Sequence, residues 1–137
     1  MFFGCPAVWM PAEGRLEPLL YDDFLYAFAE AGCKELIRVP EFPQNDPIHV
    51  LPLAGLQHRT VPFPSKGSLV APDESFLFTV DWDSFFTLFY GPRAFVERIV
   101  RARKLEGFFA APITEHAWYN YSLGCAVVTL SPEHWPA

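Results

Sequence analysis

Two neighbouring aromatic runs between residues 75 and 90 constrain the fold more than any other feature of this chain. The first run alternates two sets of side chains that are both apolar at its start: Phe76, Phe78, Val80 and Trp82 alternate with Leu77, Thr79 and Asp81. A strand with apolar side chains on both faces is typical of the middle of a sheet. We therefore expect a central strand here, with Phe78 and Val80 in the core.

The second run, residues 85–90, contains four aromatic residues. This composition favours another strand. A tight turn at 81–84, in which aspartate side chains accept backbone hydrogen bonds, would join it to the first strand. A short helix capped by Asp83 or Ser84 is the alternative.

Two segments have the apolar spacing of amphipathic helices. In residues 16–31 the apolar positions recur at helical spacing, Pro18 suits the first turn, and Gly32 suits the end. A second helix is expected from Pro92 to about Lys104. Its C-terminal half is basic and contains Arg98, Arg101, Arg103 and Lys104. These charges match the negative end of the helix dipole, so a nucleic-acid site is the less favoured interpretation.

Shorter apolar segments predict further strands at 35–39, 108–111 and 122–130. Residues 40–72 hold seven of the 14 prolines. Because proline removes a backbone donor, we expect any strand in this segment, such as 48–51 or 57–61, to lie at a sheet edge. The rest of the segment is expected to be an irregular extended arm.

The order of the expected elements is helix, several strands, helix and two strands. Without regular alternation of strands and helices, this order favours an α+β fold over a doubly wound parallel one. We expect a single globular domain over residues 1–137, with a mixed or mainly antiparallel sheet and two main helices packed on one face. The chain is long enough to form a hydrophobic core without metal or disulfide support.

The net charge of −6 is unevenly distributed. Residues 1–90 carry 12 acidic and five basic residues, which gives −7, and the remainder is close to neutral. A negative surface repels nucleic acid and anionic lipid and attracts a basic partner. No apolar run approaches the roughly 18 residues that a membrane helix requires. We therefore expect neither a nucleic-acid partner nor a membrane partner.

The cysteines indicate a reducing compartment. Cys5, Cys33 and Cys125 are far apart and form no CxxC or Cys/His metal spacing. Their odd number fits no disulfide framework, so we expect three free thiols. Pro6 and Pro11 interrupt the apolar N-terminus before the core of a signal peptide could form. We expect a cytoplasmic protein that binds no metal and no cofactor.

The common catalytic fingerprints are absent from the sequence. It contains neither GxGxxG nor GxxxxGKS/T, and neither GxSxG nor HExxH. This argues against the usual phosphate-binding loops and against zinc-protease chemistry.

Two polar clusters within aromatic sequence are candidates for a catalytic site. The carboxylates of Asp81 and Asp83 could point the same way along an extended chain, where they could together hold a cation or act as an acid/base pair. In the second cluster His116 could act as a base or metal ligand beside Glu115, oriented by one of these aspartates. The candidate binding residues around them are Trp82, Ser84, Trp118, Tyr119 and Asn120. The simpler interpretations are a turn that satisfies its own backbone donors and a structural histidine.

Two functional hypotheses follow. The first is a small acidic cytoplasmic protein without catalytic activity that binds a protein partner or its own copy. Aromatic residues make up 17% of the chain, and aromatic, charge-poor stretches are typical of interface centres. This hypothesis predicts at least a homodimer. The second is a hydrolase or small-ligand enzyme whose pocket contains Asp81, Asp83, Glu115 and His116.

Overall fold

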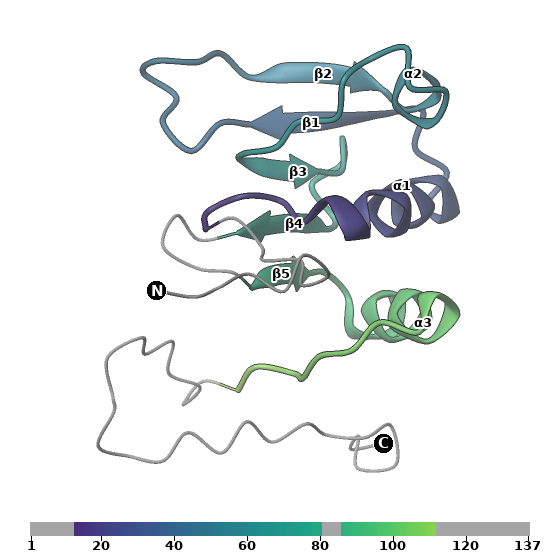
Figure 1. The fold of residues 1–137 in the computed structure, drawn as a ribbon. Helices are drawn as coiled ribbons and strands as arrows, with labels where there is room; N and C mark the ends of the chain where they lie inside the picture. Colours follow the sequence, from purple (N-terminus) through teal and green to yellow (C-terminus); the bar gives the residue numbers. More distant parts are fainter. Residues whose placement is uncertain (1–12, 81–85, 112–137) are drawn as a thin grey trace, which may run out of the picture. The chain divides into compact units, whose positions relative to one another are not determined.

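A computed structural model describes residues 13–80 and 86–111 of the chain. The chain divides into two compact units, Met1–Ile99 and Val100–Ala137. All strands of the described part belong to the first unit, where they form one sheet (Figure 1). The sheet, its core and its two faces are thus properties of the first unit.

The sheet has five strands in the order β2-β1-β3-β4-β5, and every neighbouring pair is antiparallel. The strands are β1 Glu35–Val39, β2 His49–Pro52, β3 Ser68–Val70, β4 Leu77–Val80 and β5 Thr87–Tyr90. β4 lies between β3 and β5, which confirms the central strand predicted from the aromatic alternation. β5 confirms a strand, rather than a helix, in the second aromatic run. The predicted α+β class is confirmed.

Helices precede, interrupt and follow the strands. They are α1 Tyr21–Glu30 with a preceding 3-10 turn η1 Pro18–Leu20, α2 Leu53–Gln57, and α3 Arg93–Arg103. The Glu17 carboxylate accepts a hydrogen bond of 3.2 Å from the Leu19 amide and caps the turn. Gly32 adopts a φ of +75° after α1, as a glycine at a helix end commonly does. α1 and α3 confirm the two helices predicted from apolar spacing.

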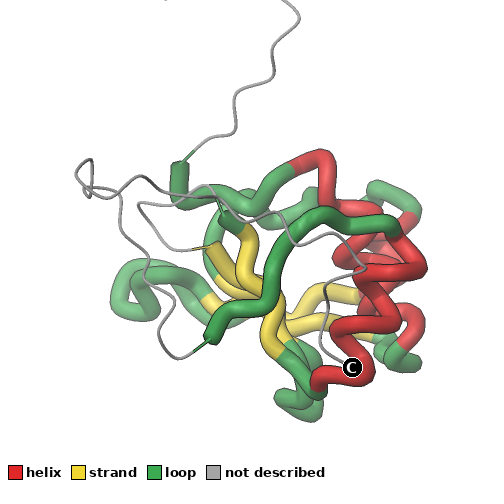
Figure 2. Tube along the Cα trace, turned by 90° about the horizontal axis from the view of Figure 1, so that it is seen from below, coloured by secondary structure: helices red, strands yellow, loops and turns green. Residues whose placement is uncertain are grey.

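The core lies between the helices and one face of the sheet, which we call the covered face, and it combines aliphatic side chains with a group of aromatic rings in mutual contact. The ring centroids of Phe24 in α1 and Phe78 in β4 are 4.7 Å apart, and those of Phe28 and Phe76 are 4.9 Å apart. Phe95 in α3 lies 4.8 Å from Phe76. Rings in such contacts gain energy beyond their buried area. α1 and the N-terminal part of α3 thus pack on the same side of the strands (Figure 2).

The proline-rich segment 40–72 is not the irregular arm that its composition predicts. It contains β2, α2 and β3, and β3 lies in the middle of the sheet rather than at an edge. Pro64 and Pro72 flank β3 without entering it, and Pro52 is the N-cap residue of α2. Proline removes hydrogen bonds only at the position it occupies. Its density over a segment therefore does not determine where the strands of that segment lie.

Of the remaining strand predictions, two are confirmed and two are wrong. β1 coincides with the strand expected at 35–39. β2 is an edge strand, as expected for 48–51. Residues 57–61 instead end α2 and continue as turns, and residues 108–111 form no strand. A short apolar run becomes a strand only where another strand pairs with its backbone, and the run itself does not encode that neighbour. The turn at 81–84 and the strand at 122–130 lie outside the described residues.

Candidate functional site

The candidate catalytic and binding residues from the sequence all lie outside the described residues. They are Asp81, Trp82, Asp83, Ser84, Glu115, His116, Trp118, Tyr119 and Asn120. The enzyme hypothesis that depends on them stays a prediction. The described residues point instead to the sheet face opposite the helices.

This opposite face, which we call the open face, carries an uninterrupted row of apolar side chains. Antiparallel pairing aligns Ile37 with Val50 on one side and with Val70 on the other. It also aligns Val70 with Leu77, and Leu77 with Tyr90. Side chains directly opposite each other in an antiparallel pair lie on the same face. One residue from each of the five strands therefore joins this apolar row.

The apolar row is exposed to solvent at both ends. Val50 is 57% exposed and Tyr90 is 55% exposed, while the three residues between them are half-buried. Leu69 and Phe78, which are sequence neighbours of row residues but point to the covered face, are almost completely buried. A contiguous exposed apolar surface indicates an interaction site more strongly than a single exposed side chain does.

A second row lies beside the apolar row on the open face and contains two hydroxyl groups. It consists of Val39, Ser68, Thr79 and Leu88. The hydroxyl oxygens of Ser68 and Thr79 are 2.7 Å apart and hydrogen-bond to each other. A polar group that already has a partner costs much less to remove from water than an unpaired one. The open face can therefore be covered by an apolar surface at little cost.

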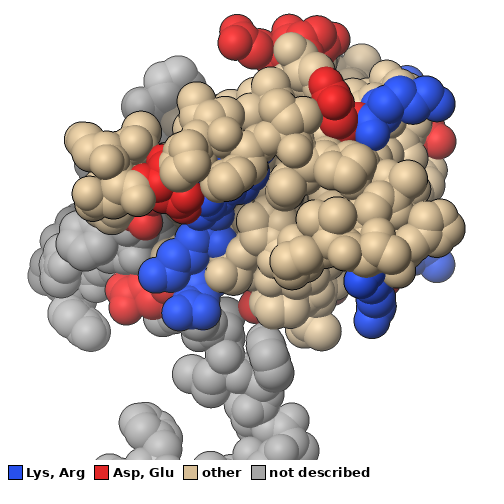
Figure 3. Space-filling view, turned by 90° about the horizontal axis from the view of Figure 1, so that it is seen from above, with Lys and Arg blue, Asp and Glu red and all other residues tan. Residues whose placement is uncertain are grey.

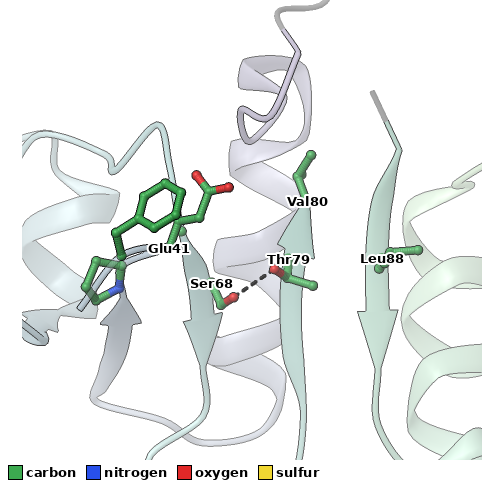
Figure 4. A pocket seen from close by; sticks show the side chains of 8 residues that line it. Glu41, Ser68, Thr79, Val80 and Leu88 are labelled. Carbon is green, nitrogen blue, oxygen red and sulfur yellow. Dashed lines mark hydrogen bonds between the residues drawn. The ribbon is translucent and has the colours of Figure 1, made fainter. Parts of the chain in front are cut away.

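An open hollow of about 750 Å³ borders the second row (Figure 4). Ser68, Thr79 and Leu88 line it from the strands, and Glu41 lines it from the loop after β1. The other lining residues are Pro40, Phe42, Gly67 and Val80. A concave site with mostly apolar lining and a few polar groups suits a small molecule or an inserted side chain.

Gly67 allows the chain that enters β3 to approach β1 closely. Its φ is +93°, and a Cβ atom at this position would lie 2.4 Å from the Val39 carbonyl oxygen. Other residues rarely adopt this backbone conformation, and none could keep that distance. Glycine at this position therefore places Ser68 beside β1 at the floor of the hollow.

The covered face becomes polar at the end of β1 and the start of β2. Arg38 aligns with Leu69 in the sheet, and its guanidinium contacts the Asp46 carboxylate and donates to the Lys66 carbonyl oxygen at 3.1 Å. His49 Nε2 lies 3.4 Å from the other carboxylate oxygen of Asp46. The hydrogen bond from Arg38 is the main cause that lowers the pKa of Asp46, and His49 adds to it. These contacts attach the loop between β1 and β2 to the sheet.

The described ranges contain no metal-binding cluster, and the charges on the side seen in Figure 3 are mixed. On the side of the molecule seen in Figure 3, acidic and basic side chains are interspersed. The described residues contain no group of three or more His, Cys, Asp or Glu side chains placed to hold a metal ion. Cys33 is a free thiol, and burial and then the nearby Asp73 raise its pKa. Cys5 and Cys125 lie outside the described residues.

The helices of the described part are all too short or too polar to cross a membrane. A family model described as "Protein of unknown function (DUF2711)" matches residues 4–120, which is most of the chain. The chain belongs to the DUF2711 family. No curated protein and no solved structure matches it. The DUF2711 match includes every described residue, so the sheet and both of its faces lie within the family's domain.

The apolar row and the hollow were not found from the sequence, although part of the signal is present there. Ile37 and Val39 lie on one face of β1 and Leu36 on the other, so each face of the strand carries an apolar residue. This pattern indicates a strand between two apolar layers. The pattern does not reveal where the two layers come from. In the described part, helices supply only the layer on the covered face.

Proposed function

We propose that this DUF2711 protein is a small cytoplasmic protein-binding module that acts through its open face. The observation that carries the proposal is the apolar row, which crosses every strand of the described sheet and is more than half exposed at both ends. Keeping apolar surface in water costs roughly 25 cal/mol per Å². A bound protein surface would remove that cost. The odd number and wide spacing of the three cysteines support the cytoplasmic part of the proposal.

The hollow adds specificity to this surface. It lies beside the second row, and Phe42 at its wall is 59% exposed. In protein interfaces a few aromatic or aliphatic side chains inserted into pockets supply most of the binding energy. The hollow is therefore the expected receptor for an anchor residue of the partner, and the apolar row forms the surrounding contact.

The experiment is site-specific photo-crosslinking in cells of the native host. The photoreactive residue p-benzoylphenylalanine replaces Val50 on the open face, and in the control chain it replaces Leu19. Leu19 is a matched control because it is a large apolar residue that is 73% exposed but belongs to η1. We expect a discrete crosslinked product from position 50 that position 19 does not form.

The molecular mass of the product and its peptides identify the partner, whether it is another protein or the same chain. Equal, diffuse crosslinking from positions 50 and 19 would contradict the proposal. So would the absence of any product from position 50, because a residue at a protein-binding surface must lie within reach of the bound partner.

A further inference from the structure

The two rows of the open face contain no charged residue although the chain as a whole is acidic. The net charge is −6, yet neither row of the open face contains a charged residue. Glu35, in the first position of β1, shares the open face with Ile37 but lies at its rim, and Glu41 lines the hollow from the loop after β1. In a two-fold interface a surface patch meets its own copy, so a charge near its centre lies close to an identical charge. The two rows at the centre of the open face avoid that repulsion.

The polar groups of the open face also favour an apolar partner surface. The hydroxyl groups of Ser68 and Thr79 hydrogen-bond to each other. The other side chains of the two rows are hydrocarbon, apart from the Tyr90 hydroxyl at one end. A partner that depended on many hydrogen bonds would leave its own donors and acceptors unpaired against such a surface. A second open face has the same composition and brings no such groups to the contact.

We propose that a second copy of the chain docks its open face on the open face of the first. This inference rests on the proposed function and names the partner of the same surface. Twisted sheets pack face to face about 10 Å apart with their strands inclined by about 30°. Helices cover the other face of the sheet in the single chain (Figure 2). The dimer would thus place two sheets between two helical layers, with both apolar rows buried.

The size of the face determines how tight this dimer is. Five strands about 4.8 Å apart make a face roughly 20 Å wide. A contact of this width falls at the small end of specific interfaces, near or below about 1,200 Å² in total. We therefore expect a reversible dimer that forms at micromolar concentration, stabilised at its centre by the rows and at its side by the hollow.

Sedimentation equilibrium over the micromolar range tests the proposal on the full chain. The wild-type mass should rise with concentration from 15.6 kDa towards twice that value. Val50→Lys and Tyr90→Lys, at opposite ends of the apolar row, should each raise the dissociation constant at least about tenfold, because an ammonium group would be buried without a partner. Leu19→Lys should behave like the wild type. Circular dichroism melts verify that all three variants fold.

The outcomes separate this inference from the proposed function. A dimer that Val50→Lys and Tyr90→Lys weaken and Leu19→Lys does not supports the inference. A mass of 15.6 kDa at every concentration, together with a crosslink from position 50 to another protein, overturns the inference that the partner is a second copy. It leaves the proposed function intact. A dimer that persists in both row variants overturns docking through the open face. If position 50 then also forms no crosslink, the proposed function fails as well.

Discussion

The two faces of the sheet are made from neighbouring residues of similar chemistry, yet their surroundings differ completely. Along β3 and β4, Leu69 and Phe78 point to the covered face and are almost completely buried. Val70 and Leu77, their sequence neighbours, point to the open face and are half-buried. The side chains do not cause this difference, since both sets are large and apolar. The helices that pack on one face cause it.

This contrast shows that an apolar residue in a strand has two different uses. On the covered face the rings interlock, for example Phe78 stacked on Phe89 with 4.2 Å between centroids. Their burial stabilises the fold of each chain. On the open face the strand register aligns the side chains, but nothing in the described part encloses them. Burying them would therefore stabilise a complex with a partner. Substitutions on the two faces should therefore affect different measurements.

The largest effect is expected on the covered face. Phe78→Ala should reduce the free energy of unfolding by about 3 to 5 kcal/mol, because it removes a ring from the centre of the core. Leu77→Ala, one residue away on the open face, should cost only about 1 kcal/mol in the monomer, because that side chain is half-buried. Urea denaturation at low protein concentration measures both. A loss below about 1 kcal/mol for Phe78→Ala would mean that the two faces are assigned the wrong way round.

Gly67 tests how the strand register is maintained between β1 and β3. Gly67→Ala should destabilise the chain by about 2 kcal/mol or more, because it adds both an unfavourable φ and a clash with the Val39 carbonyl. Gly32→Ala is the matched control, since Gly32 also has a positive φ but a Cβ added there would meet no atom within 4 Å. Thermal or urea unfolding of the two variants gives the steric contribution by difference. Equal losses would show that the close approach to β1 is unimportant.

The hydroxyl pair of the open face should show non-additive behaviour. Thr79→Val should cost about 1 kcal/mol, because it leaves the Ser68 hydroxyl without its partner. The double variant Ser68→Ala with Thr79→Val should be close to neutral, because no unpaired hydroxyl remains. A double-mutant cycle from urea denaturation measures the coupling. Additive losses would indicate that the two hydroxyls act independently. Covering the open face would then cost more, because each hydroxyl would lose its contact with water without a partner.

The smallest effect is expected at the polar end of the covered face. Because Arg38 and His49 lower the pKa of Asp46 in the folded chain, its carboxylate stabilises the fold above its ordinary pKa of 3.8. That stabilisation should disappear as the pH falls below 3.8 through the lowered value. Asp46→Asn should therefore be less stable than the wild type near neutral pH, and the difference should vanish in acid. Thermal melts across this pH range measure it, and a difference that does not change with pH would refute the role of the carboxylate.

Local features of the sequence were enough to predict the main elements of the fold. Pro18, Gly32 and the apolar spacing between them predicted the helix that contains α1, a short apolar segment predicted β1, and alternating apolar residues predicted β4. Capping, helical periodicity and strand alternation depend only on residues that are close together in the chain. They can be recognised without knowing what lies beside the element in space. The α+β class followed from the order of these elements.

Only the tertiary structure determined the position of β3 and the existence of the open face. Ser68–Val70 is too short and too near prolines to be predicted as a central strand, yet β1 and β4 pair with it on both sides. Ile37, Val70 and Leu77 are spread over a long stretch of sequence, and strand register alone aligns them in one row. A strand that is apolar on both faces requires two apolar layers, but its sequence does not state where they come from. Register and layer order depend on contacts between residues distant in the chain, and these contacts leave no local pattern.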